Sequence, residues 1–352
     1  MLNISPYNHL PLDASDINFR MQHLRAFELI DMIGNNKLDI FKDDPSLCKY
    51  LDTWDELQKS LFIESLMLDF PIPAFYFDGS LSRWKIIDGI KRILAIYNFI
   101  SGAYQLTGLD YYAKEAENCF YDGLPGHLRN RIRNAEFVVY IINPGTPLPI
   151  RYNLFKRINT TGLKKEIKGD YSQYGTKIRN IFFRGKVNGL IRKLDRNTDF
   201  RAVTKNITVI PAGNKVIRRR EYISLFIAFQ IMGVNSNCGN LEEYVSTALL
   251  LLYQQFDNYE EKLLFAFAKS MERMHKLSLD TLHHLETGRY RLLFNALATN
   301  LVELSDEEYD KLKDQASSFL SDYKAMARPI HFKREAFSLF NEIYNIINKY
   351  IQ

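Results

Sequence analysis

The residues best suited to chemistry by type and spacing are Asp88, Gly89, Lys91 and Arg92. They lie where an expected strand, residues 84–87, gives way to an expected apolar helix, residues 93–100. A glycine at such a turn lets the backbone approach a ligand closely, and the free N–H groups at the helix start attract an anion. Lys91 or Arg92 would bind phosphates, and Asp88 would bind a metal ion, a ribose hydroxyl or a water. The alternative is an ordinary turn in which Asp88 caps the helix and both cations are solvated.

Sequence blocks on both sides of this turn occur in the order typical of one family. Upstream, Trp54 is followed by I-E-S at 63–65 and by P-I-P at 71–73. The turn reads D-G-I-K-R, and residues 155–162 read F-K-R-I-N-T-T-G. A further block, I-R-N-I-F-F-R-G-K-V-N-G-L-I, occupies residues 178–191. Together these blocks resemble the N-terminal domain of GmrSD-type modification-dependent restriction enzymes, a bacterial family related to the ParB and sulfiredoxin fold.

The resemblance implies an α+β fold: a ParB/sulfiredoxin-like domain over residues 1–217, followed by an all-helical domain over residues 218–352. It also implies binding of a nucleoside triphosphate with Mg²⁺, with or without hydrolysis, in a restriction-type or anti-phage defence system. Asp88 would be the catalytic group. The nucleotide-binding residues implied are Gly89, Lys91, Arg92, Asn159, Thr160, Gly162, Arg179 and Asn180.

The chain departs from the family pattern where catalysis is concerned. The family's turn reads D-G-Q-Q-R, whereas this chain has Ile90 and Lys91 in place of the two glutamines. A glutamine amide can orient a water, and Ile90 cannot. A second possibility is therefore a degenerate, non-catalytic member that binds DNA or a partner subunit. The C-terminal half shows no H…N…H pattern, so we expect no intrinsic nuclease and any DNA cleavage to come from a separate subunit.

Charge is placed unevenly along the chain. Residues 164–220 contain sixteen Lys or Arg and four acids, a local charge of +12, although the whole chain carries only +5. Such a segment would attract a nucleic-acid backbone, with Phe182, Phe183 and Phe200 available for stacking. The alternative is that its cations pair with acids of the C-terminal half. The nucleic-acid-binding residues implied are Lys164, Lys165, Lys168, Arg218, Arg219 and Arg220.

Periodicity supports the two-part organisation. Before residue 150, helical segments (26–33, 58–68, 93–101) alternate with short apolar strands (74–77, 84–87, 137–142), and a helix is expected over 152–158. After residue 218 the pattern is helical throughout, at 222–232, 241–256, 260–275, 290–304 and 332–350. The three cysteines have no metal-ligand spacing, and no apolar run is long enough to span a bilayer, so we expect a cytoplasmic protein without a metal site of its own.

Overall fold

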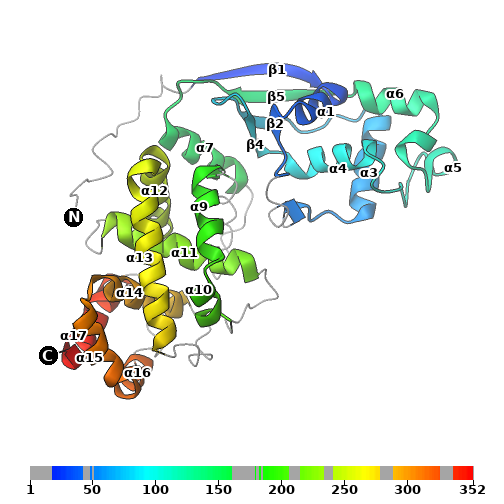
Figure 1. The fold of residues 1–352 in the computed structure, drawn as a ribbon. Coiled ribbons are helices and arrows are strands. Elements are labelled where there is room, and N and C mark those ends of the chain that lie inside the picture. The colour runs from blue at the N-terminus through cyan, green and yellow to red at the C-terminus, as the bar shows by residue number, and fades with distance from the viewer. Residues whose placement is uncertain are drawn as a thin grey trace. The chain divides into compact units, whose positions relative to one another are not determined.

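The computed structural model describes residues 18–42, 48–49, 51–160, 179, 182–183, 185–205, 215–233, 241–277, 288–325 and 336–351. The chain divides into two compact units: an N-terminal unit, Leu10–Glu166, and a C-terminal unit, Ile167–Gln352 with Met1–His9 (Figure 1). This division falls about fifty residues before the expected boundary at 217/218. In the portions covered by the structure, no helix is both long and apolar enough to cross a membrane.

The N-terminal unit is built on a five-stranded mixed sheet. Its strands are β1 (Phe19–Arg25), β2 (Leu38–Asp39), β3 (Phe75–Asp78), β4 (Trp84–Asp88) and β5 (Glu136–Ile142). They are ordered β1-β5-β3-β4-β2; β2 runs parallel to β4 and β3 parallel to β5, and the other pairs are antiparallel. The expected strands are thus β3, β4 and β5, to which the structure adds β1 and β2.

One face of the sheet forms the core of this unit. Phe75, Phe77 and Phe137 point to it, and the rings of Phe75 and Phe137 meet edge to face at 5.0 Å. Because alternate residues of a strand face opposite sides, these residues share one face with Val139 and Ile141. Buried residues of α1 (Ala26–Gly34), α3 (Glu56–Met67), α4 (Ile90–Ile100) and α6 (Gly126–Asn134) complete the core.

The opposite face is partly covered by α7 (Leu148–Thr160), which lies beneath the strands in Figure 1. From this helix, Arg151 Nη1 donates to the buried carboxylate of Asp78 at 3.2 Å and also to the hydroxyl of Ser80. Ion pairing between α7 and the strand end thus fixes the helix on this face.

Buried polar groups of α3 hold the connection between α4 and β5. This connection contains α5 (Ala113–Ala116) and a 3₁₀ turn, η2 (Tyr121–Gly123). The buried carboxylate of Glu64 accepts hydrogen bonds from the amides of residues 110, 111 and 112, at 3.1, 2.7 and 2.8 Å. Ser60 accepts one from the amide of Thr107 at 2.9 Å. Glu64 belongs to the I-E-S block, so this part of the family signature has a structural role here.

The C-terminal unit is helical. Its helices are α9 (Lys186–Asp195), α10 (Thr198–Val203), α11 (Lys215–Met232), α12 (Leu241–Gln254), α13 (Phe256–Lys276), α14 (Gly288–Glu303), α15 (Asp306–Asp314), α16 (Ala316–Ala325) and α17 (Ala336–Ile351). Phe200 of α10 packs edge to face on Phe267 of α13 at 5.2 Å, and Phe226 of α11 does the same. These contacts place α10 in the C-terminal core, which is why the units divide before residue 217.

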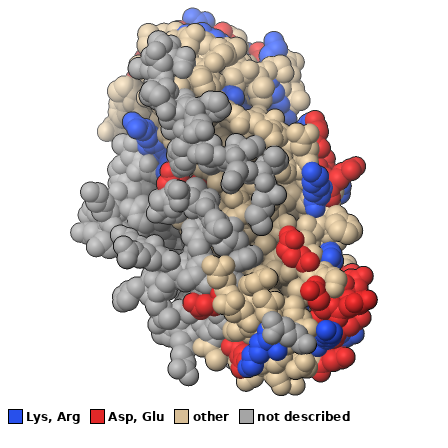
Figure 2. Space-filling view, turned by 90° about the vertical axis from the view of Figure 1, so that its left-hand side faces the viewer, with Lys and Arg blue, Asp and Glu red and all other residues tan. Residues whose placement is uncertain are grey.

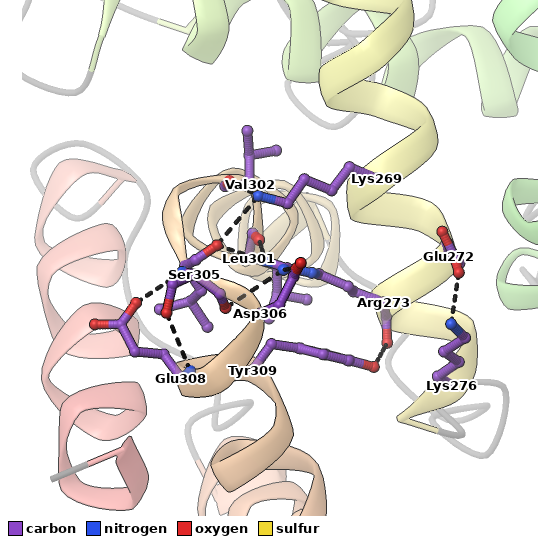
Figure 3. Close-up of polar contacts among 11 residues, drawn as sticks. Lys269, Glu272, Arg273, Lys276, Leu301, Val302, Ser305, Asp306, Glu308 and Tyr309 are labelled. Atoms are coloured by element: carbon purple, nitrogen blue, oxygen red, sulfur yellow. Dashed lines mark hydrogen bonds and ion pairs between the residues drawn. The ribbon is translucent and has the colours of Figure 1, made fainter.

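The C-terminal end of α14 is held by two cations of α13 (Figure 3). Arg273, with a side chain only 6% exposed, donates from Nη1 to the carbonyls of Leu301 and Leu304 at 2.7 and 2.8 Å. Lys269 donates to the carbonyls of Val302 and Leu304. Tyr309 of α15 donates to the carbonyl of Arg273 at 2.9 Å, and its ring lies 4.7 Å from the guanidinium. The carbonyls left free at a helix end are thus satisfied by positive side chains, which the helix dipole also favours.

Two aromatic residues of the C-terminal helices are on the surface. Phe265 of α13 is 72% exposed and Tyr344 of α17 is 51% exposed, whereas Phe267 and Phe294 are buried. The positions of Phe265 and Phe267 two apart on one helix explain this, because residues at that spacing face different directions.

Candidate functional site

The turn between β4 and α4 has the geometry expected where a glycine lets the backbone come close to a neighbouring group. Gly89 has φ 100° and ψ 8°, in the left-handed region, and forms the N-cap of α4. A Cβ on Gly89 would lie 2.3 Å from a ring carbon of Phe75, which is fully buried. No side chain caps α4, so the first amides of the helix have no acceptor among the contacts that the structure describes. The turn therefore presents amide donors with positive character, next to the ring of Phe75.

Arg92 makes its described contacts within the chain. Its Nη2 lies 3.0 Å from Asp88 Oδ2 and 3.3 Å from the carbonyl oxygen of Ala74. Its Nη1 donates to the carbonyl of Pro73, and the guanidinium lies 4.3 Å from the centre of the Phe75 ring. Burial lowers the pKa of Arg92, and the attraction of Asp88 opposes that effect. Arg92 thus ties the start of β3 to the end of β4.

Asn159 brings a third block of the family signature to the same turn. Its side-chain amide donates to the carbonyl of Ile87 and to that of Phe155, each at 2.9 Å. The P-I-P block, the D-G-I-K-R turn and the F-K-R-I-N block, far apart in sequence, thus meet through two side chains. Apart from Asp88, the partners of Arg92 and Asn159 are main-chain carbonyls, which is why residue types alone did not reveal them.

Two groups at the turn remain available to a ligand. Lys91, on the first turn of α4, makes no ion pair or side-chain hydrogen bond within the described residues, and neither does Asp88 Oδ1. Asp88 Oδ2 is held by Arg92, so the carboxylate is oriented while one oxygen stays open. A lone carboxylate oxygen next to a phosphate site fits Mg²⁺, which takes one or two carboxylates and completes its shell with phosphate and water oxygens.

Of the other residues expected at this site, the structure describes the side chain of Arg179 alone. Arg179 lies in the C-terminal unit, where it is buried and paired with Glu242 of α12. Thr160 ends α7, and its side chain is not described. Gly162 and Asn180 lie outside the described residues, so their assignment stays a prediction.

Several described cations of the basic segment pair with acids. Arg219 forms a two-pronged pair with Asp195, at 2.5 and 3.2 Å, and Arg220 is buried. Lys186 pairs with Asp257, and Lys193 lies 3.9 Å from Glu260. On the face drawn in Figure 2, basic and acidic side chains are interspersed, and the acidic ones are most crowded at the lower right. Lys186 and Lys193 thus lie beside acids of the C-terminal half, whereas Arg219 pairs with an acid of the segment itself. Lys164, Lys165, Lys168 and the side chain of Arg218 lie outside the described part.

The aromatic residues expected to stack on nucleic acid are buried. Phe182, Phe183 and Phe200 are 6%, 0% and 0% exposed. Phe183 packs against Phe182 and Tyr253, and Phe200 packs in the aromatic core described above. That expectation was wrong, because aromatic residues between cations can equally serve a helical core.

Comparison with known proteins supports the assignment of the N-terminal unit. A search of curated proteins and a search of solved structures each gave no match. The family model for the N-terminal domain of the GmrSD restriction endonuclease matches residues 51–168. That segment contains the turn at Gly89, the anchoring residues Glu64 and Arg92, and Asn159. The chain thus carries, over residues 51–168, a domain of the GmrSD N-terminal family, which indicates a component of a restriction-type system.

Proposed function

We propose that the N-terminal unit binds a nucleoside triphosphate with Mg²⁺ at the turn between β4 and α4, in a bacterial restriction or anti-phage defence system. The observation that carries the proposal is the turn itself. The first amides of α4 have no described acceptor, and Lys91 and one oxygen of Asp88 lie beside them without described partners. We further propose that the unit's mixed sheet is of the ParB and sulfiredoxin type, which the family match supports.

Each residue has a distinct role in this proposal. Lys91 and the first amides of α4 bind the phosphates. Asp88 binds Mg²⁺ or a ribose hydroxyl through its open oxygen. Arg92 and Asn159 are positioning residues, because the partners described for their side chains are Asp88 and main-chain carbonyls of the chain itself.

Hydrolysis should be slow or absent. Ile90 occupies the place of a family glutamine and has no group to orient a water. The remaining groups would clamp phosphates in the ground state and transition state alike, which gives binding without rate acceleration. Phosphate release measured with each nucleotide tests this. Turnover within the ordinary range of about 1–10³ s⁻¹ would show that another group is catalytic.

Calorimetric titration of the full chain with ATP, GTP, CTP and UTP in the presence of magnesium tests binding. Lys91→Ala should lower the affinity for the nucleotide about tenfold or more, because it removes a charge-assisted contact of about 1.5–3 kcal/mol. Lys114→Ala is the matched control, since Lys114 is exposed on α5 of the same unit, and it should bind as the wild type does. Equal affinities for the two variants, or no binding of any nucleotide by the wild type, would overturn the proposal.

A further inference from the structure

We infer that the N-terminal unit pairs with a second copy of this chain through β1, the strand at one end of the sheet order. Two β1 strands would run antiparallel across a twofold axis and join the sheets of the two copies edge to edge. Strands β5 and β3 separate β1 from the turn between β4 and α4, so this interface can be tested without a nucleotide.

The main-chain groups of alternate β1 residues point away from β5. The two strands pair residue by residue along the whole of β1. Beyond one end, the amide of Asn143 donates to the carbonyl of Asn18 at 2.9 Å. Beyond the other end, the amide of Ala26 donates to the carbonyl of Ala135 at 3.0 Å. Opposite residues of an antiparallel pair exchange hydrogen bonds at every second position. The even-numbered residues of β1 therefore bond to β5, and residues 19, 21, 23 and 25 direct their N–H and C=O groups to the free edge.

This free edge is closed at one end. The outward amide of Arg25 donates to Glu28 Oε2 at 2.6 Å, in the capping box of α1. The outward main-chain groups of Phe19, Met21 and His23 have no partner among the residues that the structure describes. One antiparallel register with a second copy uses all of these groups: Met21 opposite the partner's Met21, and Phe19 opposite the partner's His23. The twofold axis would thus pass at Met21.

The side chains of this edge suit pairing with their own copies. Phe19 and Met21 are large apolar residues that are 40% and 58% exposed. Alternate residues of a strand share a face, so both side chains lie on the same face as that of His23. In the register given above, the two Met21 side chains meet at the axis, with a Phe19 and a His23 facing each other on either side. Pairing would therefore cover apolar surface that a single copy exposes.

Charge favours a second copy over an acidic peptide as the occupant. β1 contains no acid, but both of its arginines are engaged within the unit. The Arg20 guanidinium lies over the ring of Trp84, 5.2 Å from its centre, and Arg25 pairs with Glu136 at 3.2 Å. In the inferred register Arg20 lies opposite the partner's Gln22, so no two cations are directly opposed. The edge is thus compatible with its own copy and offers little unpaired charge to an acidic segment.

Sedimentation equilibrium of the full chain over a range of concentrations tests the association. The wild type should dimerise reversibly. Met21→Lys should raise the dissociation constant about tenfold or more, because two like charges would meet at the axis. Leu57→Lys makes the same kind of change at a position of α3 that is 46% exposed, and it should dimerise as the wild type does. Met21→Pro is a second variant: it removes an outward N–H while the even-numbered residues keep their bonds to β5, and it should also prevent pairing.

Cysteine cross-linking tests the register. In Met21→Cys the two new thiols would lie at the axis, on hydrogen-bonded positions whose Cα atoms are about 5.5 Å apart, within the range of a disulfide. In the control His23→Cys, the two positions are offset by four residues, about 14 Å along the strands. Mild oxidation should therefore link Met21→Cys into a dimer in far higher yield than His23→Cys or the wild type, whose own three cysteines give the background.

Three results would overturn the inference. The first is a wild type that stays monomeric at every concentration. The second is a dimer that Met21→Lys leaves intact, because the copies would then associate through another surface. The third is efficient cross-linking of His23→Cys in place of Met21→Cys, which would move the axis away from Met21. Melting curves of each variant separate loss of pairing from loss of the fold, and Met21→Lys should melt as the wild-type monomer does because the side chain that it replaces is mostly exposed.

Discussion

Gly89 is constrained both by its backbone conformation and by the lack of space above it. Its φ is 100°, and a Cβ would contact the buried Phe75 ring at 2.3 Å. Gly102, at the end of α4, also has a positive φ, of 72°, but nothing lies within 4 Å of its Cβ position. Gly102→Ala should therefore cost only the conformational term, about 1–2 kcal/mol. Gly89→Ala should cost about 1–3 kcal/mol more, because Phe75 has to move. Urea denaturation of both variants measures the difference in stability. Equal losses of stability would show that the Phe75 ring moves aside at no cost.

Glu117 should make the stability of the N-terminal unit depend on pH. Hydrogen bonds from the amides of Gly108 and Leu109 lower the pKa of Glu117 below its ordinary value of 4.5. A folded-state pKa that is lower than the unfolded one stabilises the fold above about pH 4.5, and this stabilisation is lost as the pH falls through the folded pKa. Glu117→Gln should thus be less stable than the wild type near neutral pH, and the gap should close in acid. A constant gap across pH would mean that the charge of Glu117 is irrelevant.

At the scale of single elements, the C-terminal end of α14 depends on Arg273 (Figure 3). Arg273→Ala would leave the carbonyls of Leu301 and Leu304 without their donor and remove the ring contact with Tyr309. We expect a loss of about 2–4 kcal/mol in the free energy of unfolding. Lys276→Ala, three residues further along α13, removes only an exposed pair with Glu272 and should leave the stability nearly unchanged.

A further substitution separates helix capping from ion pairing at Arg273. Asp306 contacts Arg273 at 2.5 Å, but its side chain is 95% exposed. Asp306→Asn should therefore have a small effect on the thermal midpoint. If it destabilised the protein as much as Arg273→Ala does, the ion pair would be the main interaction and the carbonyl contacts secondary.

The elements that the sequence predicts well are those with strong local signals. The turn at Gly89 follows from a glycine between an apolar strand and an apolar helix, and α12, α13 and α14 follow from their helical periodicity. β1 was missed because its residues are mostly exposed and include Arg20, His23 and Arg25, so it lacks the alternation of a half-buried strand. α15 was missed although Ser305 and Glu308 form a capping box, a signal that the sequence does carry.

The contacts at the site were harder to predict than its residues. Asp88, Gly89 and Lys91 follow from the strand, turn and helix, which are local. The other partners of Arg92, besides Asp88, lie eighteen and nineteen residues away on a connection with no regular structure, and their main-chain carbonyls carry no residue-specific signal. Only the tertiary fold places them under the guanidinium.

At the scale of the whole molecule, described cations of residues 164–220 pair both with an acid of that segment, Asp195, and with acids outside it, Asp257 and Glu242. The side chain of Arg219 is 19% exposed and forms an ion pair with Asp195. Arg219→Ala therefore leaves the largely buried carboxylate of Asp195 without this partner. We expect a loss of about 1–3 kcal/mol in stability, with no change in DNA retention. Lys186→Ala removes the same charge from an exposed pair and should change neither property. Melting curves and gel shifts at several salt concentrations decide this; weaker DNA retention by Arg219→Ala alone, at unchanged stability, would assign Arg219 to a nucleic-acid interface.

The pairing of β1 with β5 determines where the protein can be truncated without exposing its sheet and core. The recognised family segment starts at residue 51, whereas β1, α1 and β2 lie before it and supply Ala26, Leu29, Ile33 and Leu38 to the core. A truncation at residue 51 would turn β5 into an edge strand with seven partners missing and would open one side of the core to water. Unpaired apolar edges promote aggregation. Expression of the isolated segment would therefore yield insoluble material, and a fragment meant to retain the proposed nucleotide site should begin ahead of Phe19.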